Sequence, residues 1–267
     1  MDKRPIAFFD SGLGGLSCVE ALLRRLPSES LLYYGDTLRA PYGDRSREEL
    51  ALFADQIADF LLAQDIKLLI VACNTVSALY IDGLSARCGP VPVLGMVDVT
   101  SRYLAARYAH KRLGIIATRA TVNSGAYQRR IREAGYPAQV PALACPGFVP
   151  LIEAGVCDGP ELEAAIRDTL DAFVREHRPE ALVLACTHFP FIREPIRRLY
   201  PDLELIDPAE FVAQGAEELL RSRDALAPAD ALPRRRFFAS KVTQPFRDAV
   251  CKVTGDESQS LERKTFE

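Results

Sequence analysis

Two cysteines stand at the ends of two similar apolar segments of this 267-residue chain. Cys73 follows the run 68–72, and Cys186 follows the run 181–185. Runs of this length and composition are typical of strands buried on both faces of a parallel sheet. Ligands bind at the carboxyl ends of such strands. Two thiols that face each other across one cleft would suit acid–base chemistry that inverts a stereocentre.

Each cysteine has a neighbour that can help it to exchange a proton. A thiol with a pKa of about 8.5 is a poor base until a nearby group stabilises the thiolate or accepts its proton. His188 lies just beyond Cys186, and Asp10 ends an earlier apolar segment that we expect beside Cys73. A single cysteine at a strand end is more often an inert core residue. Two at matching positions favour a site.

Small polar side chains surround the same strand ends. Such groups suit a zwitterionic amino acid, whose carboxylate and ammonium need several hydrogen bonds once they leave water. The turn 10–15 holds three glycines but lacks the spacing of a dinucleotide fingerprint, so a ligand site and a tight structural turn are equally good interpretations. The segment 33–43 has the composition of a functional loop, although a solvated turn is the alternative. The polar residues are Asn74, Thr75, Thr118, Thr121 and Thr187.

The elements that must position these residues alternate between strand and helix patterns, as in α/β proteins. Ser46 and Glu49 have the spacing of a capping box, and Asp207 with Pro208 is expected to open the C-terminal helix. The separation from the first strand tip to the first cysteine nearly matches the same separation in the second half, which indicates a duplicated unit. The predicted strands lie at 6–9, 31–34, 67–72, 91–97, 112–118, 180–185 and 203–206.

Composition excludes several classes of function. The chain is 48% hydrophobic and 26% charged with a net charge of −3, which gives no electrostatic case for nucleic acid or an anionic membrane as a partner. No apolar stretch reaches the roughly 18 residues of a membrane span, and the first residues lack the pattern of a signal peptide. Seven cysteines without a CxxC motif are typical of reduced thiols in the cytoplasm. No cluster has the spacing of zinc ligands, so we expect no metal.

Six short motifs follow one another between about residue 6 and about residue 210. They are Phe9-Asp10-Ser11-Gly12-Leu13-Gly14-Gly15, Gly35-Asp36-Thr37 with Pro41-Tyr42-Gly43, Ala72-Cys73-Asn74-Thr75, Thr118-x-x-Thr121, Phe148-Val149-Pro150-Leu151-Ile152-Glu153 and Ala185-Cys186-Thr187-His188. This ordered set resembles the aspartate/glutamate racemase family. The second motif resembles the glutamate enzymes of that family rather than the aspartate enzymes.

The resemblance implies a cofactor-independent isomerase that interconverts L- and D-glutamate with two bases. One cysteine, as a thiolate, would remove the α-proton, and the other, as a thiol, would return a proton to the opposite face. Asp10 would assist Cys73, while His188 and Glu153 would assist Cys186. The residues implied to hold or cover the substrate are Ser11, Pro41, Tyr42, Gly43, Asn74, Thr75, Thr118, Thr121 and Thr187.

The resemblance also implies an architecture and a role. Two similar, pseudo-symmetric α/β domains with mainly parallel sheets would enclose the active site in the cleft between them. Residues 1–97 and 208–267 would form the first domain, to which a C-terminal helix returns, and residues 98–207 the second. The protein would be a cytoplasmic homodimer that supplies D-glutamate for peptidoglycan. The polar tail after Gly255 is expected to be mobile.

Three other functions stay open at this point. A racemase of the same superfamily that acts on aspartate or another small amino acid would carry similar motifs. A cysteine hydrolase would use Cys186 as nucleophile and His188 as base, and would not need Cys73. A binding or interaction module without catalytic activity is the third alternative, because one fold serves many functions.

Overall fold

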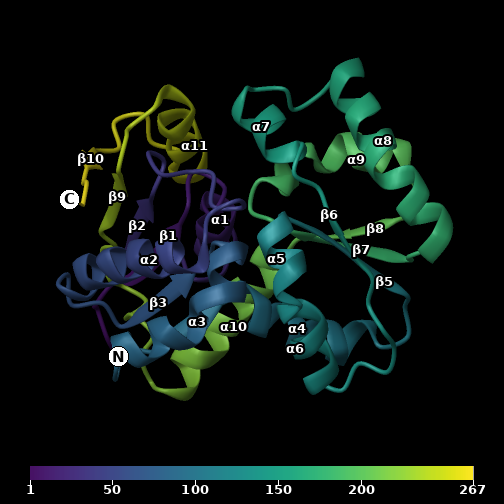
Figure 1. Cartoon of the computed structure of the whole chain (residues 1–267). Coiled ribbons are helices and arrows are strands. Elements are labelled where there is room, and N and C mark those ends of the chain that lie inside the picture. The colour runs from purple at the N-terminus through teal and green to yellow at the C-terminus, as the bar shows by residue number, and fades with distance from the viewer. Residues whose placement is uncertain (267) are drawn as a thin grey trace.

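The structure, a computed structural model, describes residues 1–266 and consists of two lobes, each built on a parallel sheet (Figure 1). In spatial order, the first sheet contains β10 (Leu261–Arg263), β9 (Arg235–Ala239), β2 (Leu31–Gly35), β1 (Ile6–Asp10), β3 (Leu68–Val71) and β4 (Val93–Gly95). The second contains β6 (Ala142–Ala144), β5 (Leu113–Ala117), β7 (Ala181–Ala185) and β8 (Glu204–Ile206). All strand pairs are parallel. The predicted α/β class with mainly parallel sheets is therefore confirmed.

Helices connect the strands, as parallel pairing requires. The sheet of the first lobe is accompanied by α1 (Leu16–Arg25), α2 (Arg47–Leu62), α3 (Asn74–Cys88), α10 (Pro208–Ser222) and α11 (Gln244–Thr254). The second lobe contains α4 (Met96–Tyr108), α5 (Arg119–Ser124), α6 (Ala126–Glu133), α7 (Phe148–Glu153), α8 (Pro160–His177), the 3₁₀ turn η1 (Phe189–Ile192) and α9 (Arg193–Leu199). None of the helices within the described residues combines the length and apolarity needed to cross a membrane.

Alternation along β1 shows how the first sheet is covered on both faces. Ile6 and Phe8 join the core that includes α1, α10 and α11, while Ala7 and Phe9 join the core beneath α2 and α3. Successive strand side chains point to opposite faces, so a strand buried on both sides must be apolar throughout. The capping box at the start of α2 forms as predicted: Ser46 accepts from the Glu49 backbone and Glu49 accepts from the Ser46 backbone.

The two lobes share one hydrophobic core. The cluster that contains β1 and α1 continues through α4 and α6 to β5 and β7 of the second lobe. Helix α10 packs on both α1 and α4, and Figure 1 shows it at the junction of the lobes. The lobes therefore pack directly against each other. The domain limits 1–97, 98–207 and 208–267 stay predictions; the first of these limits falls within α4.

Three expectations about secondary structure were wrong. The segment 91–97 forms only a short strand, β4, because α4 already begins at Met96. The helix opened by Pro208 is not the last element, since β9, α11 and β10 follow. Part of the tail after Gly255 is ordered in β10, where backbone pairing with β9 and the packing of Phe266 against Tyr34 and Phe60 compensate for its polar composition.

Candidate active site

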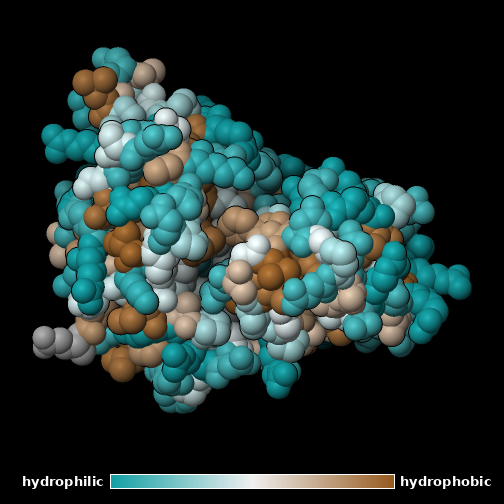
Figure 2. All heavy atoms as spheres, turned by 90° about the horizontal axis from the view of Figure 1, so that it is seen from above, coloured by the Kyte–Doolittle hydropathy of each residue, from teal (hydrophilic) through white to brown (hydrophobic). Residues whose placement is uncertain are grey.

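A cavity of about 50 Å³ lies between the carboxyl ends of the two sheets, at the bottom of the hollow that Figure 2 shows between the lobes. One water needs roughly 10–15 Å³ by comparable measures, so the space suits a small ligand. Eleven of the predicted site residues line it: Ser11, Pro41, Tyr42, Gly43, Cys73, Asn74, Thr75, Thr118, Cys186, Thr187 and His188. Asp10, Thr121 and Glu153 are not among the lining residues, but each contacts one of them.

Cys73 occupies the junction between β3 and α3, where it is the residue before the first turn of the helix. Its side chain is 4% exposed. Burial, and then the negative charge of Asp10, raise the pKa of the Cys73 thiol to about 12. In the free protein Cys73 is therefore a protonated thiol, ready to donate a proton rather than to accept one.

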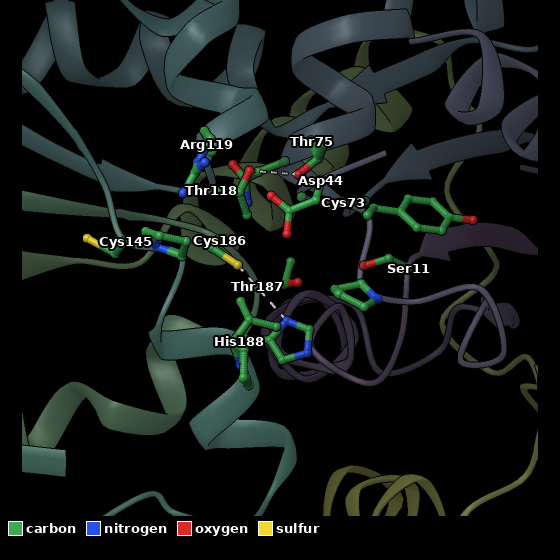
Figure 3. A pocket seen from close by; sticks show the side chains of 17 residues that line it. Ser11, Asp44, Cys73, Thr75, Thr118, Arg119, Cys145, Cys186, Thr187 and His188 are labelled. Atoms are coloured by element: carbon green, nitrogen blue, oxygen red, sulfur yellow. Dashed lines mark hydrogen bonds between the residues drawn. The ribbon is translucent and has the colours of Figure 1, made fainter. Parts of the chain in front are cut away.

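Cys186 occupies the equivalent place after β7 and enters the cavity from the second lobe, whereas Cys73 enters from the first (Figure 3). Its Sγ lies 4.0 Å from Nδ1 of His188, within reach of a weak sulfur hydrogen bond. Nε2 of His188 lies 3.2 Å from Oε1 of Glu153, close enough for a charge contact although not aligned as a hydrogen bond. The Cys186 thiol thus contacts the His188 imidazole on one side, and the Glu153 carboxylate contacts it on the other.

His188 is almost completely buried, directly before the start of η1. Burial alone lowers its pKa, because it penalises the imidazolium cation. Its contacts with Cys186 and Glu153 outweigh that effect and raise the pKa of His188 to about 10. The imidazolium therefore places a positive charge 4.0 Å from the sulfur of Cys186.

Asp10 lies behind the cavity at the tip of β1 and is fully buried. Its Oδ2 accepts hydrogen bonds from the backbone amides of Gly12 and Gly15, both at 3.0 Å. Its Oδ1 accepts a hydrogen bond of 3.2 Å from the Thr187 hydroxyl of the other lobe. The turn 10–15 therefore binds a carboxylate of the protein itself, and Asp10 is a fixed anion beside Cys73.

Threonine hydroxyls join the lobes on another side of the cavity. Oγ1 of Thr75 lies 3.1 Å from Oγ1 of Thr118, which lies 3.0 Å from Oγ1 of Thr121 (Figure 3 draws the first of these contacts). Thr118 also caps α5, because its hydroxyl accepts a hydrogen bond from the Thr121 backbone. Thr121 therefore orients the two hydroxyls that line the cavity.

Asn74 supplies a free donor to the same wall. Its Oδ1 accepts a hydrogen bond of 2.6 Å from the Tyr127 hydroxyl, which fixes the orientation of the amide. Its Nδ2 is buried and has no partner among the described residues. A buried donor without a partner is costly, so this group is suited to a ligand acceptor such as a carboxylate oxygen.

The loop between β2 and α2 covers the cavity. Pro41, Tyr42 and Gly43 line it, as expected. Tyr42 is buried, and its hydroxyl donates to the carboxylate of Asp36. The carbonyl of Gly43 accepts a hydrogen bond of 3.3 Å from the backbone of Ala120, so the loop is joined to the second lobe.

Sequence reasoning missed several lining residues. Asp44 and Arg119 stand next to predicted residues at the exposed rim of the cavity, and that adjacency was the available signal. The remainder belong to the segment that contains the Phe148–Glu153 motif, of which only Glu153 was given a role. These residues are Cys145, Pro146, Val149 and Pro150. Within residues 1–266, no group of three or more His, Cys, Asp or Glu side chains is arranged to hold a metal ion.

Known proteins are similar to this chain over nearly its whole length. Residues 13–216 match the model of the Asp/Glu/Hydantoin racemase family. The chain belongs to this racemase family. The glutamate racemase of Chlorobaculum tepidum is 40% identical to it, over 97% of this chain and 95% of the relative. The expectation that this protein is an isomerase is confirmed by its membership of the family.

Solved structures of family members have the same fold. The glutamate racemase of Francisella tularensis, in complex with D-glutamate, superimposes with a TM-score of 0.90 at 34% identity, covering 99% of this chain and 98% of that one. The glutamate racemase of Thermus thermophilus, in complex with β-chloro-D-alanine, gives a TM-score of 0.86 at 37% identity, covering 100% and 99%. The racemase fold extends through both lobes.

Proposed function

We propose that this protein interconverts L- and D-glutamate by transferring protons at the α-carbon between two cysteines. The observation that carries the proposal is that Cys73 and Cys186, one from each lobe, line a single cavity. The choice of glutamate is supported by the similarity of the chain, from 34% to 40% identity, to enzymes named glutamate racemase. One of them was crystallised with D-glutamate.

In one direction Cys186 acts as the base. The imidazolium of His188, whose pKa is raised by Cys186 and Glu153 against the effect of burial, stabilises the Cys186 thiolate. The thiolate takes the α-proton, and the electron pair of the broken C–H bond remains on the α-carbon. The Cys73 thiol then gives its proton to the opposite face, which leaves a thiolate at Cys73 and a thiol at Cys186. No other reactant is consumed.

In the reverse direction Cys73 is the base. Its thiolate faces the fixed negative charge of Asp10, and burial adds to the cost of that charge. A thiolate whose conjugate thiol has a raised pKa is a stronger base, so this environment increases the drive to remove a proton from carbon. Asp10 thus assists Cys73 by raising its basicity, while His188 and Glu153 assist Cys186 by stabilising its anion.

Charged ends of the substrate require hydrogen bonds once they enter the cavity. We assign a substrate carboxylate to the unpaired Nδ2 of Asn74 together with nearby hydroxyl groups. Preorganised donors of this kind stabilise the negative charge that develops when the α-proton leaves. The loop residues Pro41, Tyr42 and Gly43 exclude water above them. The hydroxyl groups belong to Ser11, Thr75, Thr118 and Thr187, with Thr121 as their support.

The proposal extends to the cofactor requirement, the compartment, the oligomeric state and the use of the product. We propose that the enzyme needs no cofactor, because the two thiols and their charged neighbours account for both proton transfers. We also propose that it works in the cytoplasm as a homodimer and that its product, D-glutamate, is used in peptidoglycan synthesis.

Solvent-proton exchange tests the proposed function directly. The purified protein is incubated in D₂O with L-glutamate, D-glutamate, L-aspartate or D-aspartate, and deuterium at the α-carbon is followed by NMR together with optical rotation. We expect uptake and loss of rotation with both glutamate enantiomers. Efficient exchange with aspartate but not glutamate would replace the proposed substrate. Absence of exchange with all four would reject α-proton transfer on these substrates.

A further inference from the structure

The C-terminal segment reaches the loop that covers the active site. Figure 1 shows β10 at the outer edge of the first sheet, far along the sequence from that loop. The segment is anchored by two hydrogen bonds: the Lys264 backbone donates to the Ala239 carbonyl at 3.0 Å, and its carbonyl accepts from the Tyr34 hydroxyl at 2.8 Å. Phe266 then packs on Tyr34, with ring centroids 5.5 Å apart.

Arg39 lies between this segment and the loop. Its guanidinium carbon lies 4.0 Å from the ring centroid of Phe53 and 5.6 Å from that of Phe266, both within the range of a cation–π contact. Its Nε donates to Oδ2 of Asp36 at 2.5 Å, and its Nη1 donates to Gln56 at 2.7 Å. The guanidinium is therefore held by two aromatic rings and by two side-chain acceptors.

Asp36 connects Arg39 to a residue that lines the cavity. It is fully buried, and within residues 1–266 Arg39 is the cation within ion-pair distance of it. The same carboxylate oxygen accepts from the hydroxyl of Tyr42, which lines the cavity. The Asp36 backbone donates to the carbonyl of Asp10 at 3.0 Å, so this contact network also reaches the catalytic strand tip.

We propose that Arg39 and Phe266 are positioning residues for substrate binding, through which the C-terminal segment holds the loop 36–45 closed over the cavity. This inference rests on the proposed function. Phe266 keeps the guanidinium in place, the guanidinium keeps the Asp36 carboxylate in place, and that carboxylate holds Tyr42. Displacement of the loop removes binding contacts made by Pro41 to Gly43, so it weakens substrate binding more than it slows proton transfer.

Kinetics of matched variants test the proposal. A cation–π contact of ordinary strength corresponds to about a two- to fivefold effect. We expect Phe266→Ala to raise KM for glutamate by about that factor with kcat nearly unchanged, and Phe266→Tyr to restore the wild-type KM because it keeps the ring. Arg39→Lys should raise KM as well. The double variant should raise it by less than the product of the single effects, because the residues act through one contact.

A merely structural role predicts a different pattern. Partial unfolding lowers the active fraction and hence the apparent kcat, but leaves KM unchanged. Phe173→Ala supplies the control, because this buried ring lies in α8 of the second lobe, away from the loop. It should lower Tm and leave KM at the wild-type value. A Phe266→Ala variant that behaves like Phe173→Ala would overturn the proposal.

Hydrogen exchange decides the inference even without activity. Backbone amides of Arg39, Ala40 and Arg45 are hydrogen-bonded within the loop. We expect Phe266→Ala to accelerate exchange in 36–45 while exchange in α8 stays unchanged. If wild-type protein fails to racemise glutamate, the proposed function falls, but this measurement still tests the contact between tail and loop. Unchanged exchange in 36–45 would reject that contact.

Discussion

Thr187 of the second lobe donates a hydrogen bond of 3.2 Å to the carboxylate of Asp10 in the first. The same carboxylate also accepts hydrogen bonds from the amides of Gly12 and Gly15, which lie in the turn between β1 and α1. Thr187 directly follows Cys186, and Asp10 stands beside Cys73. The Asp10 carboxylate therefore links the residue next to Cys186 with the strand tip beside Cys73. Small changes in the contact between Thr187 and Asp10 will alter the distance between the two thiols.

Gly14→Ala tests how closely the lobes must approach. An added Cβ would lie 2.6 Å from Oγ1 and 2.7 Å from the carbonyl carbon of Thr187, so the turn and the segment with Cys186 must separate. A misplacement of about 1 Å can cost about 100-fold in rate, and we expect a loss of that order in kcat/KM. Gly12→Ala is the matched control, because its Cβ meets nothing within 4 Å. Equal activity of both variants would contradict the argument.

Single cysteine replacements separate racemisation from hydrolysis. A serine hydroxyl is a much weaker acid than a thiol, so it gives up its proton less readily and does not supply the anionic base. We expect Cys73→Ser and Cys186→Ser each to reduce racemisation by about 100-fold or more. Optical rotation of L- and D-glutamate solutions gives the rates. Cys251→Ser, a partly buried cysteine in α11 outside the cavity, should retain activity. Full turnover by Cys73→Ser would favour the single-nucleophile hydrolase.

Glu153→Gln should change the pH dependence. The pKa of His188 is lowered by burial but raised overall, to about 10, by Cys186 and Glu153, and the proposed mechanism requires the cation. Wild-type kcat/KM should therefore decline as pH rises through about 10. Removing the carboxylate lowers the pKa, so the decline should begin at lower pH in the variant. A pH–rate profile measures this, with Glu161→Gln, an exposed residue of α8, as control.

The same ionisation contributes to stability. Because the pKa of His188 is higher in the folded protein than its ordinary value of about 6.5, its contribution is complete below that pH and disappears as pH rises through about 10. Unfolding by urea at several pH values should show a loss of stability in this range that is smaller in Glu153→Gln. An identical pH dependence in both proteins would contradict the assigned contact.

A buried ion pair holds the opposite end of the first sheet. Nζ of Lys67 lies 2.6 Å from Oε2 of Glu29, and their side chains are 1% and 2% exposed. Lys67→Met leaves a buried carboxylate without its cation and should lower the free energy of unfolding by about 3–5 kcal/mol. Adding Glu29→Gln should recover part of the loss. Arg24→Met, which removes two exposed ion pairs, should change stability by less than about 1 kcal/mol.

The sequence was informative where local pattern and burial agree. Both cysteine-bearing strands are continuous apolar runs, and β3 and β7 are indeed buried along their full length. Because both sheets are parallel, the polar residues after these strands had to gather at the carboxyl edges. Cys73, Cys186 and their polar neighbours accordingly line one cavity.

Contacts between residues that are far apart in the sequence could not be predicted from local patterns. Tyr127 lies on an amphipathic helix, and its hydrogen bond to Asn74 spans 53 positions. The strand β10 has one apolar residue, Leu261. It forms because its backbone pairs with the edge of β9 and because Phe266 packs against the rings of Tyr34 and Phe60. Asp44 and Arg119 line the cavity only because the loop and α5 meet across the cleft. Such contacts depend on the assembled fold.

The two thiols have unequal surroundings: an anion beside Cys73, and an imidazole beside Cys186. Mirror-image substrates have equal free energies in solution, so the equilibrium constant of the proposed reaction is one. By the Haldane relationship, kcat/KM must then be identical for the two enantiomers. The asymmetry of the protein can appear only in kcat and KM taken separately. The enantiomer that is turned over with the higher kcat must also have the higher KM.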